Sequence, residues 1–257
     1  MKRLIASEFQ RIFENRTNQI LLVFYLGMII LMCIFRYISP QGSYDCVDYN
    51  VDLNRLNFSP FTFYEIGGVL VYLILPILFI SSINYEQSIG AFRMYVTRPY
   101  KKYEFIVSKW VALTITTFIL MFIAFIIITI FGYLFMPNVS SVKFYEIQQE
   151  FSMSGALLYT VKFFITQFII ALCVLSISSI IGIVISNPIL SILAVIAALA
   201  GLSLYIKFFE FLDKTTEYGF YVLSNTASMS FYITLISTLL GGLLVSIFLW
   251  QKKDYLY

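Results

Sequence analysis

The sequence predicts an all-α integral membrane protein with six transmembrane helices, and two observations support that prediction. Of its 257 residues, 60% are hydrophobic and only 12% are charged, whereas a soluble globular domain carries about 25% charged residues. The apolar residues also gather in runs, and about 20 apolar residues in a helix cross a bilayer. The polar segments between the runs are too short for a separate soluble domain, so we expect a single transmembrane domain over residues 1–257.

The apolar runs predict the six spans in order. They cover about residues 17–35, 66–84, 106–135, 163–186, 189–206 and 231–250. The third should end before Met136-Pro137, and its roughly 30 helical residues would measure about 45 Å. Because the hydrocarbon core is about 30 Å thick, we expect that helix to tilt or protrude into the cytoplasm. Asn187-Pro188 is a turn signal and predicts a tight hairpin of the fourth and fifth spans.

Residues 1–16 predict an amphipathic helix at the membrane interface, ahead of the first span. Ile5, Phe9 and Ile12 share one helical face, and polar residues occupy the opposite face. Such a helix lies in the plane of the membrane surface. A signal peptide is the alternative, but the segment carries two acids and no small-residue cleavage site follows the next apolar run.

Residues 36–65 and 207–230 are predicted to form loops on the side of the membrane opposite the two termini. In residues 36–65, Asp45, Asp48 and Asp52 lack the alternating ligands and the glycine of a calcium loop, which favours a solvated surface. Residues 207–230 are rich in aromatic residues, which predicts a segment that dips back into the interface. These aromatic residues are Phe208, Phe209, Phe211, Tyr218, Phe220 and Tyr221.

In the fifth span, small residues recur at a spacing that favours close helix packing, although chance explains the pattern equally well. They are Ala194, Ala197, Ala198 and Gly201. The three cysteines, Cys33, Cys46 and Cys173, have no metal spacing and predict no disulfide within the chain. Cys46 lies in a loop, where we expect an unpaired thiol, with pairing across a dimer as the alternative.

The distribution of basic residues predicts the orientation. Six spans place both termini on one side, and eleven of the seventeen Lys and Arg residues fall on that side. Cytoplasmic segments carry the excess of Lys and Arg. We therefore expect a multi-pass protein of the cell membrane with both termini in the cytoplasm.

The composition disfavours catalysis by this chain. There is no His, which excludes His-based metal sites and catalytic triads. The predicted spans contain no Asp or Glu, so an intramembrane enzyme would lack an acid–base group. We expect no catalytic residue, metal or cofactor on this chain, and no nucleic-acid partner.

Residues 84–110 form a basic polar segment between two strongly apolar runs, and the first half divides into two helical faces. The apolar face carries Tyr85, Ile89, Phe92 and Val96. The polar face carries Glu86, Gly90, Arg93 and Thr97. This pattern predicts a short helix that lies flat on the membrane surface. Arg98-Pro99 should end it, and a second helix can start at Pro99.

Gly90 suggests that a partner approaches the polar face closely. A glycine costs about 1 kcal/mol in a helix, so its place on the outward face needs a reason. The alternative is a solvated basic loop that only fixes the topology.

This segment resembles the first cytoplasmic loop of ABC-2-type permeases, the membrane subunits of ABC exporters. The resemblance rests on Glu86, Gly90, Arg98-Pro99, Lys101 and Lys109. In that family the loop is a coupling helix that docks on the ATP-binding subunit. The resemblance therefore implies that residues 84–105 couple this chain to an ATPase, with Glu86, Gly90, Arg93, Arg98 and Pro99 at the contact. Ile89 and Ala91 depart from the small or hydroxyl residues that flank this glycine in many members.

The resemblance extends over the six-span pattern and the aromatic segment 207–230, where such permeases commonly have short re-entrant helices. It implies an export subunit of a bacterial plasma membrane that works as a homodimer with two ATP-binding subunits. ATP and Mg would bind the partner, because this chain has no G-x-x-x-x-G-K-[ST] motif. The alternative is a non-transporting membrane immunity or scaffold protein.

The apolar spans and the acidic outer loops favour an amphipathic or antimicrobial peptide as the exported substrate. The predicted outer loops hold six basic and nine acidic residues, and a weak negative field would attract cationic cargo. A lipid, a drug or a glycan is the alternative substrate.

Overall fold

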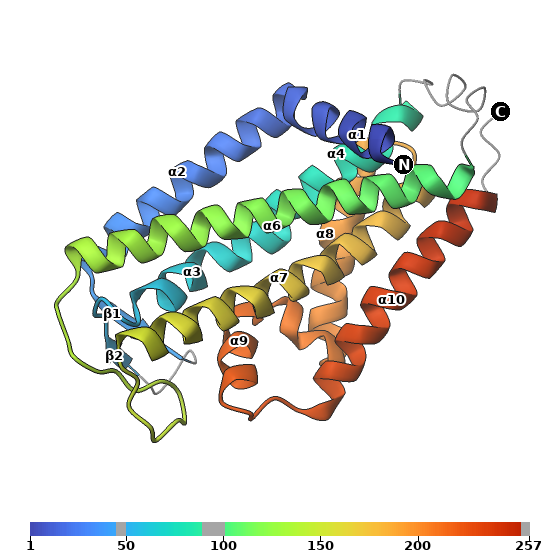
Figure 1. Cartoon of the computed structure of the whole chain (residues 1–257). Helices are drawn as coiled ribbons and strands as arrows, with labels where there is room; N and C mark the ends of the chain where they lie inside the picture. Colours follow the sequence, from blue (N-terminus) through green and yellow to red (C-terminus); the bar gives the residue numbers. More distant parts are fainter. Residues whose placement is uncertain (45–49, 89–100, 253–257) are drawn as a thin grey trace.

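The computed structural model describes residues 1–44, 50–88 and 101–252, with side chains omitted at 85–88. Within these ranges, the chain contains six helices long and apolar enough to cross a membrane (Figure 1). They are α2 (Arg16–Ile38), the α3–α4 unit (Phe58–Asn84), α6 (Lys102–Phe135), α7 (Met153–Val184), α8 (Pro188–Tyr205) and α10 (Met229–Lys252). The prediction of an all-helical membrane protein with six transmembrane helices is therefore confirmed.

The second span begins earlier than predicted. It consists of α3 (Phe58–Val69), a π-helical turn (Leu70–Ile74) and α4 (Leu75–Ser88). The predicted start at residue 66 is wrong, because Phe58, Phe61 and Phe63 are already buried in the helix. The π-helical turn directly precedes Pro76, which has no N–H to give to the preceding turn.

The third span ends where it was predicted to end, but it begins earlier than predicted. α6 ends at Phe135, directly before Met136-Pro137. At its start, the Lys101 N–H donates to the Glu104 carboxylate over 2.8 Å, which satisfies a backbone group next to the first turn. Its 34 residues correspond to about 51 Å, more than the thickness of a hydrocarbon core.

The fourth span also begins earlier than predicted. α7 starts at Met153, so residues 153–162 are helical and Lys162 is an exposed residue inside the helix. The predicted start of this span at residue 163 is therefore wrong. The hairpin to α8 is confirmed, because Asn187 caps α8 and its Oδ1 accepts from the N–H groups of Ile189 and Leu190.

α7 is the central helix, and small residues let its neighbours approach it. A Cβ added at Gly242 of α10 would lie 2.4 Å from Ser176 Cβ, so only glycine fits this crossing. One turn further on, the hydroxyl oxygens of Ser179 and Ser246 are 2.6 Å apart. Gly182 similarly admits Ile80 of α4.

The predicted small-residue stripe of α8 is only partly covered within the described chain, because Ala194 and Ala198 are half-buried. Its buried residues are Ser191, Val195, Leu199 and Ser203. Ala197 is exposed, and a Cβ added at Gly201 would meet nothing within 4 Å.

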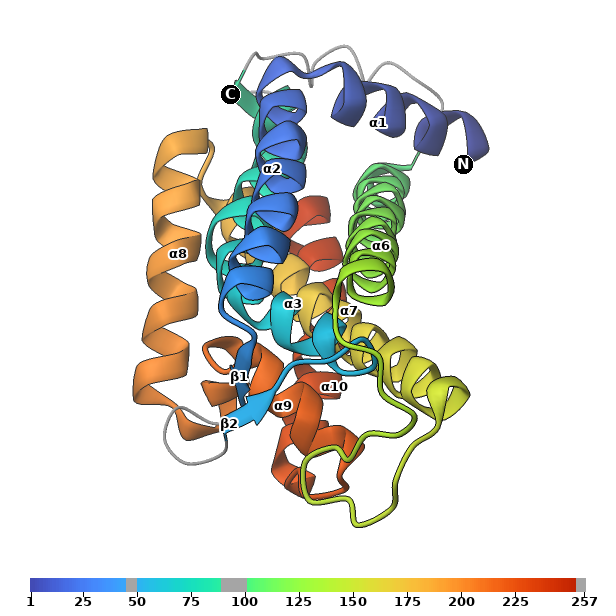
Figure 2. The ribbon, with the colours of Figure 1, turned by 90° about the vertical axis from the view of Figure 1, so that its left-hand side faces the viewer.

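The two ends of the molecule are built differently (Figure 2). One end carries β1 (Gln41–Ser43), β2 (Asn50–Asp52), the 3-10 turn Lys207–Leu212 and α9 (Thr215–Leu223). The strands pair antiparallel, with Gly42 opposite Val51. Phe211 and Phe220 are fully buried there, so part of the aromatic segment packs against the bundle, and its place in the membrane interface stays a prediction.

The other end carries α1 (Lys2–Glu14), which lies across the end of the bundle and contacts α2, the end of α4 and the start of α6. The segment is a helix as predicted, and its place at the membrane interface stays a prediction. Leu4, Glu8 and Ile12 are buried, whereas Ile5 and Phe9 are half-buried. We call this end the α1 end and the opposite one the α9 end.

Candidate functional site: a polar junction at the end of α4

The last described turns of α4 hold a series of polar groups, each of which contacts a different helix. The first is Ser81, whose hydroxyl donates to Asn18 Oδ1 of α2 over 2.7 Å. Asn18 in turn donates from Nδ2 to the carbonyl of Ile12 in α1 over 3.0 Å. Asn18 is only 1% exposed, so this chain of hydrogen bonds fixes the α1–α2 turn onto α4.

The second group is the Ser82 carbonyl, which accepts from Lys109 Nζ of α6 over 2.9 Å. Lys109 Nζ also lies 3.0 Å from Glu8 Oε2 of α1, and the two side chains are 1% and 2% exposed. A second ion pair joins Glu8 to Arg11 at 3.2 Å. A buried charge requires such a partner and further hydrogen bonds, because desolvation costs several kcal/mol per ion.

The third group is Asn84, which is fully buried. Its Nδ2 donates over 2.8 Å to the Ile185 carbonyl in the α7–α8 turn and over 2.8 Å to Ser191 Oγ of α8. The Ser191 hydroxyl itself donates to the Ile185 carbonyl over 2.8 Å. Asn84 therefore links the end of α4 to the start of the fifth span.

Together these groups form what we call the polar junction. Its members are Glu8, Asn18, Ser81, Ser82, Asn84, Lys109, Ile185 and Ser191. Through it, the end of α4 contacts α1, α2, α6 and the α7–α8 hairpin. Because each contact is a directional hydrogen bond or ion pair in a water-poor setting, a shift of α4 would have to break or exchange these contacts.

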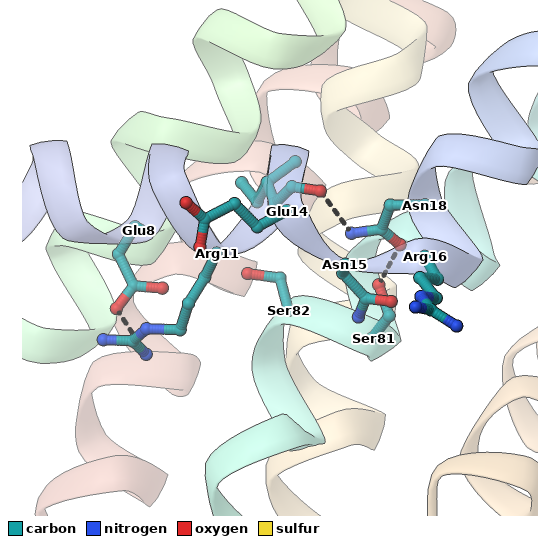
Figure 3. A pocket seen from close by; sticks show the side chains of 9 residues that line it. Glu8, Arg11, Glu14, Asn15, Arg16, Asn18, Ser81 and Ser82 are labelled. Carbon is teal, nitrogen blue, oxygen red and sulfur yellow. Dashed lines mark hydrogen bonds and ion pairs between the residues drawn. The ribbon is translucent and has the colours of Figure 1, made fainter.

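A cavity of about 370 Å³ lies beside the polar junction, between the α1–α2 turn and the end of α4 (Figure 3). It is lined by Glu8, Arg11, Ile12, Glu14, Asn15, Arg16, Asn18, Ser81 and Ser82. Nowhere in the described ranges do three or more Asp, Glu, His or Cys residues gather to hold a metal ion.

The predicted coupling residues adjoin the polar junction in the sequence. Glu86 lies in the last turn of α4, which runs without a break to Ser88. Gly90, Arg93, Arg98 and Pro99 lie outside the described residues, as does most of the predicted surface helix. Their joint role stays a prediction.

The lysines of the predicted loop do not all face water. Lys101 is the N-cap residue of α6 and is exposed. Lys109 is instead buried in the second turn of that helix. This position agrees with the third predicted span, residues 106–135, and the carboxylate of Glu8 in α1 reaches Lys109 inside the bundle.

The sequence contained a signal for this ion pair that the prediction missed. Leu4, Glu8 and Ile12 follow an i, i+4 spacing, which places an acid in the middle of an apolar stripe. Lys109 likewise sits between the apolar residues of the third span. Two opposite charges on apolar faces favour a buried pair, although neither position identifies its partner.

A second, acidic cavity of about 390 Å³ opens at the α9 end, between α3 and α9. Glu65, Asp213 and Glu217 line it together with Lys214. Glu217 is 3% exposed and accepts from the Tyr64 hydroxyl over 3.1 Å. A hydrogen bond from Lys214 to Glu210, over 2.8 Å, raises the pKa of Lys214. The lining therefore has an excess of negative charge.

Comparison with known proteins adds no relative. No protein-family model matches this chain, and no curated protein matches it.

Proposed function

We propose that this chain is the membrane-spanning permease subunit of an ATP-driven exporter. In this proposal two copies form the translocation path, and each binds a separate ATP-binding subunit through the loop 84–105. ATP and Mg bind the partner, and this chain hydrolyses nothing itself. The two termini and the α1 end face the cytoplasm, in the plasma membrane of a bacterium.

One observation carries the proposal: the polar junction is built on the residues that directly precede the predicted coupling segment. Ser81, Ser82 and Asn84 each contact a different part of the bundle. A force applied at residues 85–100 would therefore reach α2, α6 and the α7–α8 hairpin at once. A loop that only fixes topology needs no such contacts.

The mechanism we infer is a switch of contacts at the polar junction. Binding of ATP would move the partner subunit and, with it, the loop 84–105. The end of α4 would then exchange its hydrogen bonds, because packed interfaces shift between discrete arrangements rather than deform continuously. Movement of α8 through Asn84 and of α6 through Lys109 would open the path between the two copies.

For the exported substrate we propose an amphipathic or antimicrobial peptide with net positive charge. The acidic cavity at the α9 end supports this choice, since Glu65, Asp213 and Glu217 outnumber Lys214. Under the proposed orientation this cavity faces outward, where it would attract cationic groups leaving the path. A lipid, a drug or a glycan as the substrate would make the cavity irrelevant to transport.

Co-purification with the ATP-binding subunit encoded nearest to this chain tests the proposal. Gly90→Leu places bulk on the predicted docking face, and Arg93→Glu reverses a charge there. Each should weaken binding strongly, because mismatched charge at an interface costs several kcal/mol. Arg3→Glu, an exposed charge reversal on α1, is the matched control and should bind normally.

Normal binding and export by both loop variants would contradict the coupling role. If the parent chain binds no ATP-binding subunit but still protects cells from a toxic peptide, the chain is an immunity or scaffold protein instead.

Labelling with an impermeant thiol reagent tests the orientation, after Cys46 is replaced by serine. A cysteine in place of the exposed Lys207 should react in intact cells, and one in place of the exposed Gln251 should not. The reverse pattern would place the α1 end outside. Cys33 and Cys173 are buried and should stay unreacted in both.

A further inference from the structure

The cavity in Figure 3 shares part of its lining with the polar junction, but the proposed coupling gives its open space no role, and its lining is chemically mixed. Arg11 and Arg16 contribute two positive charges, and Glu8 and Glu14 contribute two negative charges. The formal charge of the lining is therefore zero, although the cavity is rich in charged groups. Such a lining suits a ligand that carries both signs of charge.

Ser82 provides an independent sign of a ligand. Its side chain lines the cavity and the residue is only 8% exposed. Its hydroxyl oxygen has no hydrogen-bond partner among the described residues. Buried hydroxyls normally have a partner, so this hydroxyl is free to donate to a group in the cavity.

The start of α2 supplies the features of an anion site. α2 begins at Arg16, with Asn15 as its N-cap residue, and both residues line the cavity. The positive end of the helix dipole attracts anions such as phosphate, while the Thr17 N–H already donates to Asn15 Oδ1. The Arg16 side chain is exposed, lines the cavity and makes no ion pair within the described part of the chain, so its guanidinium is available to such an anion if the side chain turns toward the cavity.

The two acids have different roles in the cavity. Glu8 is neutralised by Lys109 and Arg11. Glu14 accepts a hydrogen bond from Gln10 Nε2 over 2.8 Å, and it makes no ion pair with a described residue. A carboxylate without a cation next to an anion site favours a ligand with a primary ammonium group.

We propose that this cavity binds the phosphoethanolamine headgroup of a membrane lipid. Arg16 and the Ser82 hydroxyl hold the phosphate, and Glu14 accepts from the ammonium group. The cavity lies where the first span begins, at the level of lipid headgroups if α1 lies in the interface. The inference thus rests on the interfacial position of α1 and not on the coupling to an ATPase.

Thermal unfolding of the purified chain in detergent tests this site without any ATPase. The probes are phosphatidylethanolamine, phosphatidylcholine, phosphatidylglycerol and water-soluble O-phosphoethanolamine. A ligand that binds only the folded state raises Tm with its concentration. Phosphatidylethanolamine should raise Tm most, because a choline group cannot donate hydrogen bonds to Glu14 and a glycerol group carries no charge.

Three variants separate the contributions of Arg16, Ser82 and Glu14 to lipid binding. Arg16→Gln should weaken phosphatidylethanolamine binding about tenfold, as expected for one charge-assisted hydrogen bond. Ser82→Ala should weaken it less, and Glu14→Gln should remove the preference over phosphatidylglycerol. Arg3→Gln, an exposed arginine of α1 outside the cavity lining, should behave like the parent chain.

Two results would overturn the proposal. One is an unchanged lipid response in both Arg16→Gln and Ser82→Ala. The other is an equal Tm increase with O-phosphoethanolamine at the same concentration, which would identify a soluble phosphate ligand. Neither result would affect the proposed coupling, which is measured by binding of the ATP-binding subunit.

Discussion

The α1 end and the α9 end are stabilised by different kinds of contact. At the α1 end, the helices are joined by hydrogen bonds and by the buried pair of Glu8 and Lys109. At the α9 end, the helices are joined by closely packed aromatic rings in addition to hydrogen bonds such as that from Gln167 to Thr215. Phe220 of α9 has its ring centroid 4.9 Å from that of Tyr44, 5.3 Å from that of Phe61 and 5.2 Å from that of Phe163.

The difference suggests which end can move. Ring packing depends on shape, and a packed core has few alternative arrangements of similar energy. A hydrogen bond can be exchanged for another one if a second acceptor comes within reach. We therefore expect the α1 end to change its contacts during transport, while the α9 end moves as a rigid unit.

The largest effect on stability is expected for Lys109→Ala. Removing one partner of a buried ion pair costs up to about 3–5 kcal/mol in the free energy of unfolding, and here it leaves the buried Glu8 paired with Arg11. The Ser82 carbonyl would also lose its donor. Thermal unfolding in detergent should show a large decrease in Tm.

The double variant Glu8→Leu, Lys109→Met is the control for that experiment. Apolar residues of similar size often replace a buried ion pair at little cost, so the double variant should recover most of the lost stability. A double variant as unstable as Lys109→Ala would show that the pair is not the main contact.

Phe220→Ala should lower the free energy of unfolding by about 3 kcal/mol, as for other buried phenylalanines, which is somewhat less than the effect of Lys109→Ala. The variant opens a cavity among three rings at the α9 end, far from the polar junction. Export per ATP should stay near the parental value in the fraction that folds, which peptide transport into inverted vesicles would measure. A loss of coupling larger than the loss of folded protein would contradict the rigid role of this end.

The smallest effects on stability are expected for a matched pair of buried amides, one at each end. Asn84 donates to Ile185 at the α1 end. At the α9 end, Gln167 Nε2 donates to the Thr215 carbonyl over 2.9 Å. Gln167→Ala should lower the free energy of unfolding by about 1–3 kcal/mol because a buried acceptor loses its donor, and Asn84→Ala should lower it by a similar amount because two buried hydrogen bonds are lost. Equal decreases in Tm would establish that the two variants are comparable.

The sequence was sufficient to predict the spans but not all of their ends. An apolar run locates only the part of a helix that lies in lipid. The end of α6 and the α7–α8 turn were therefore predicted from Pro137 and Pro188 and not from hydropathy. The first turns of α7 carry Lys162 and extend beyond the apolar run. Helix formation there is stabilised by packing against the protein, which hydropathy does not measure.

The polar junction could not be assembled from the sequence because its partners are far apart in the chain. Glu8 and Lys109 are separated by 101 positions, and Asn84 and Ser191 by 107. Their contact depends on α1 folding back over the bundle and on the hairpin lying beside α4. A side chain such as Lys109, inside an apolar span, indicates only that a partner must exist.

The most direct test of the account compares Asn84→Ala with Gln167→Ala in the reconstituted complex with its ATP-binding subunit. The quantity measured is the amount of peptide transported per ATP hydrolysed. We expect Asn84→Ala to bind the ATP-binding subunit like the parent chain and to lose most of this ratio, while Gln167→Ala keeps it. An unchanged ratio in Asn84→Ala, or an equal loss in Gln167→Ala, would contradict the claim that the end of α4 transmits the coupling.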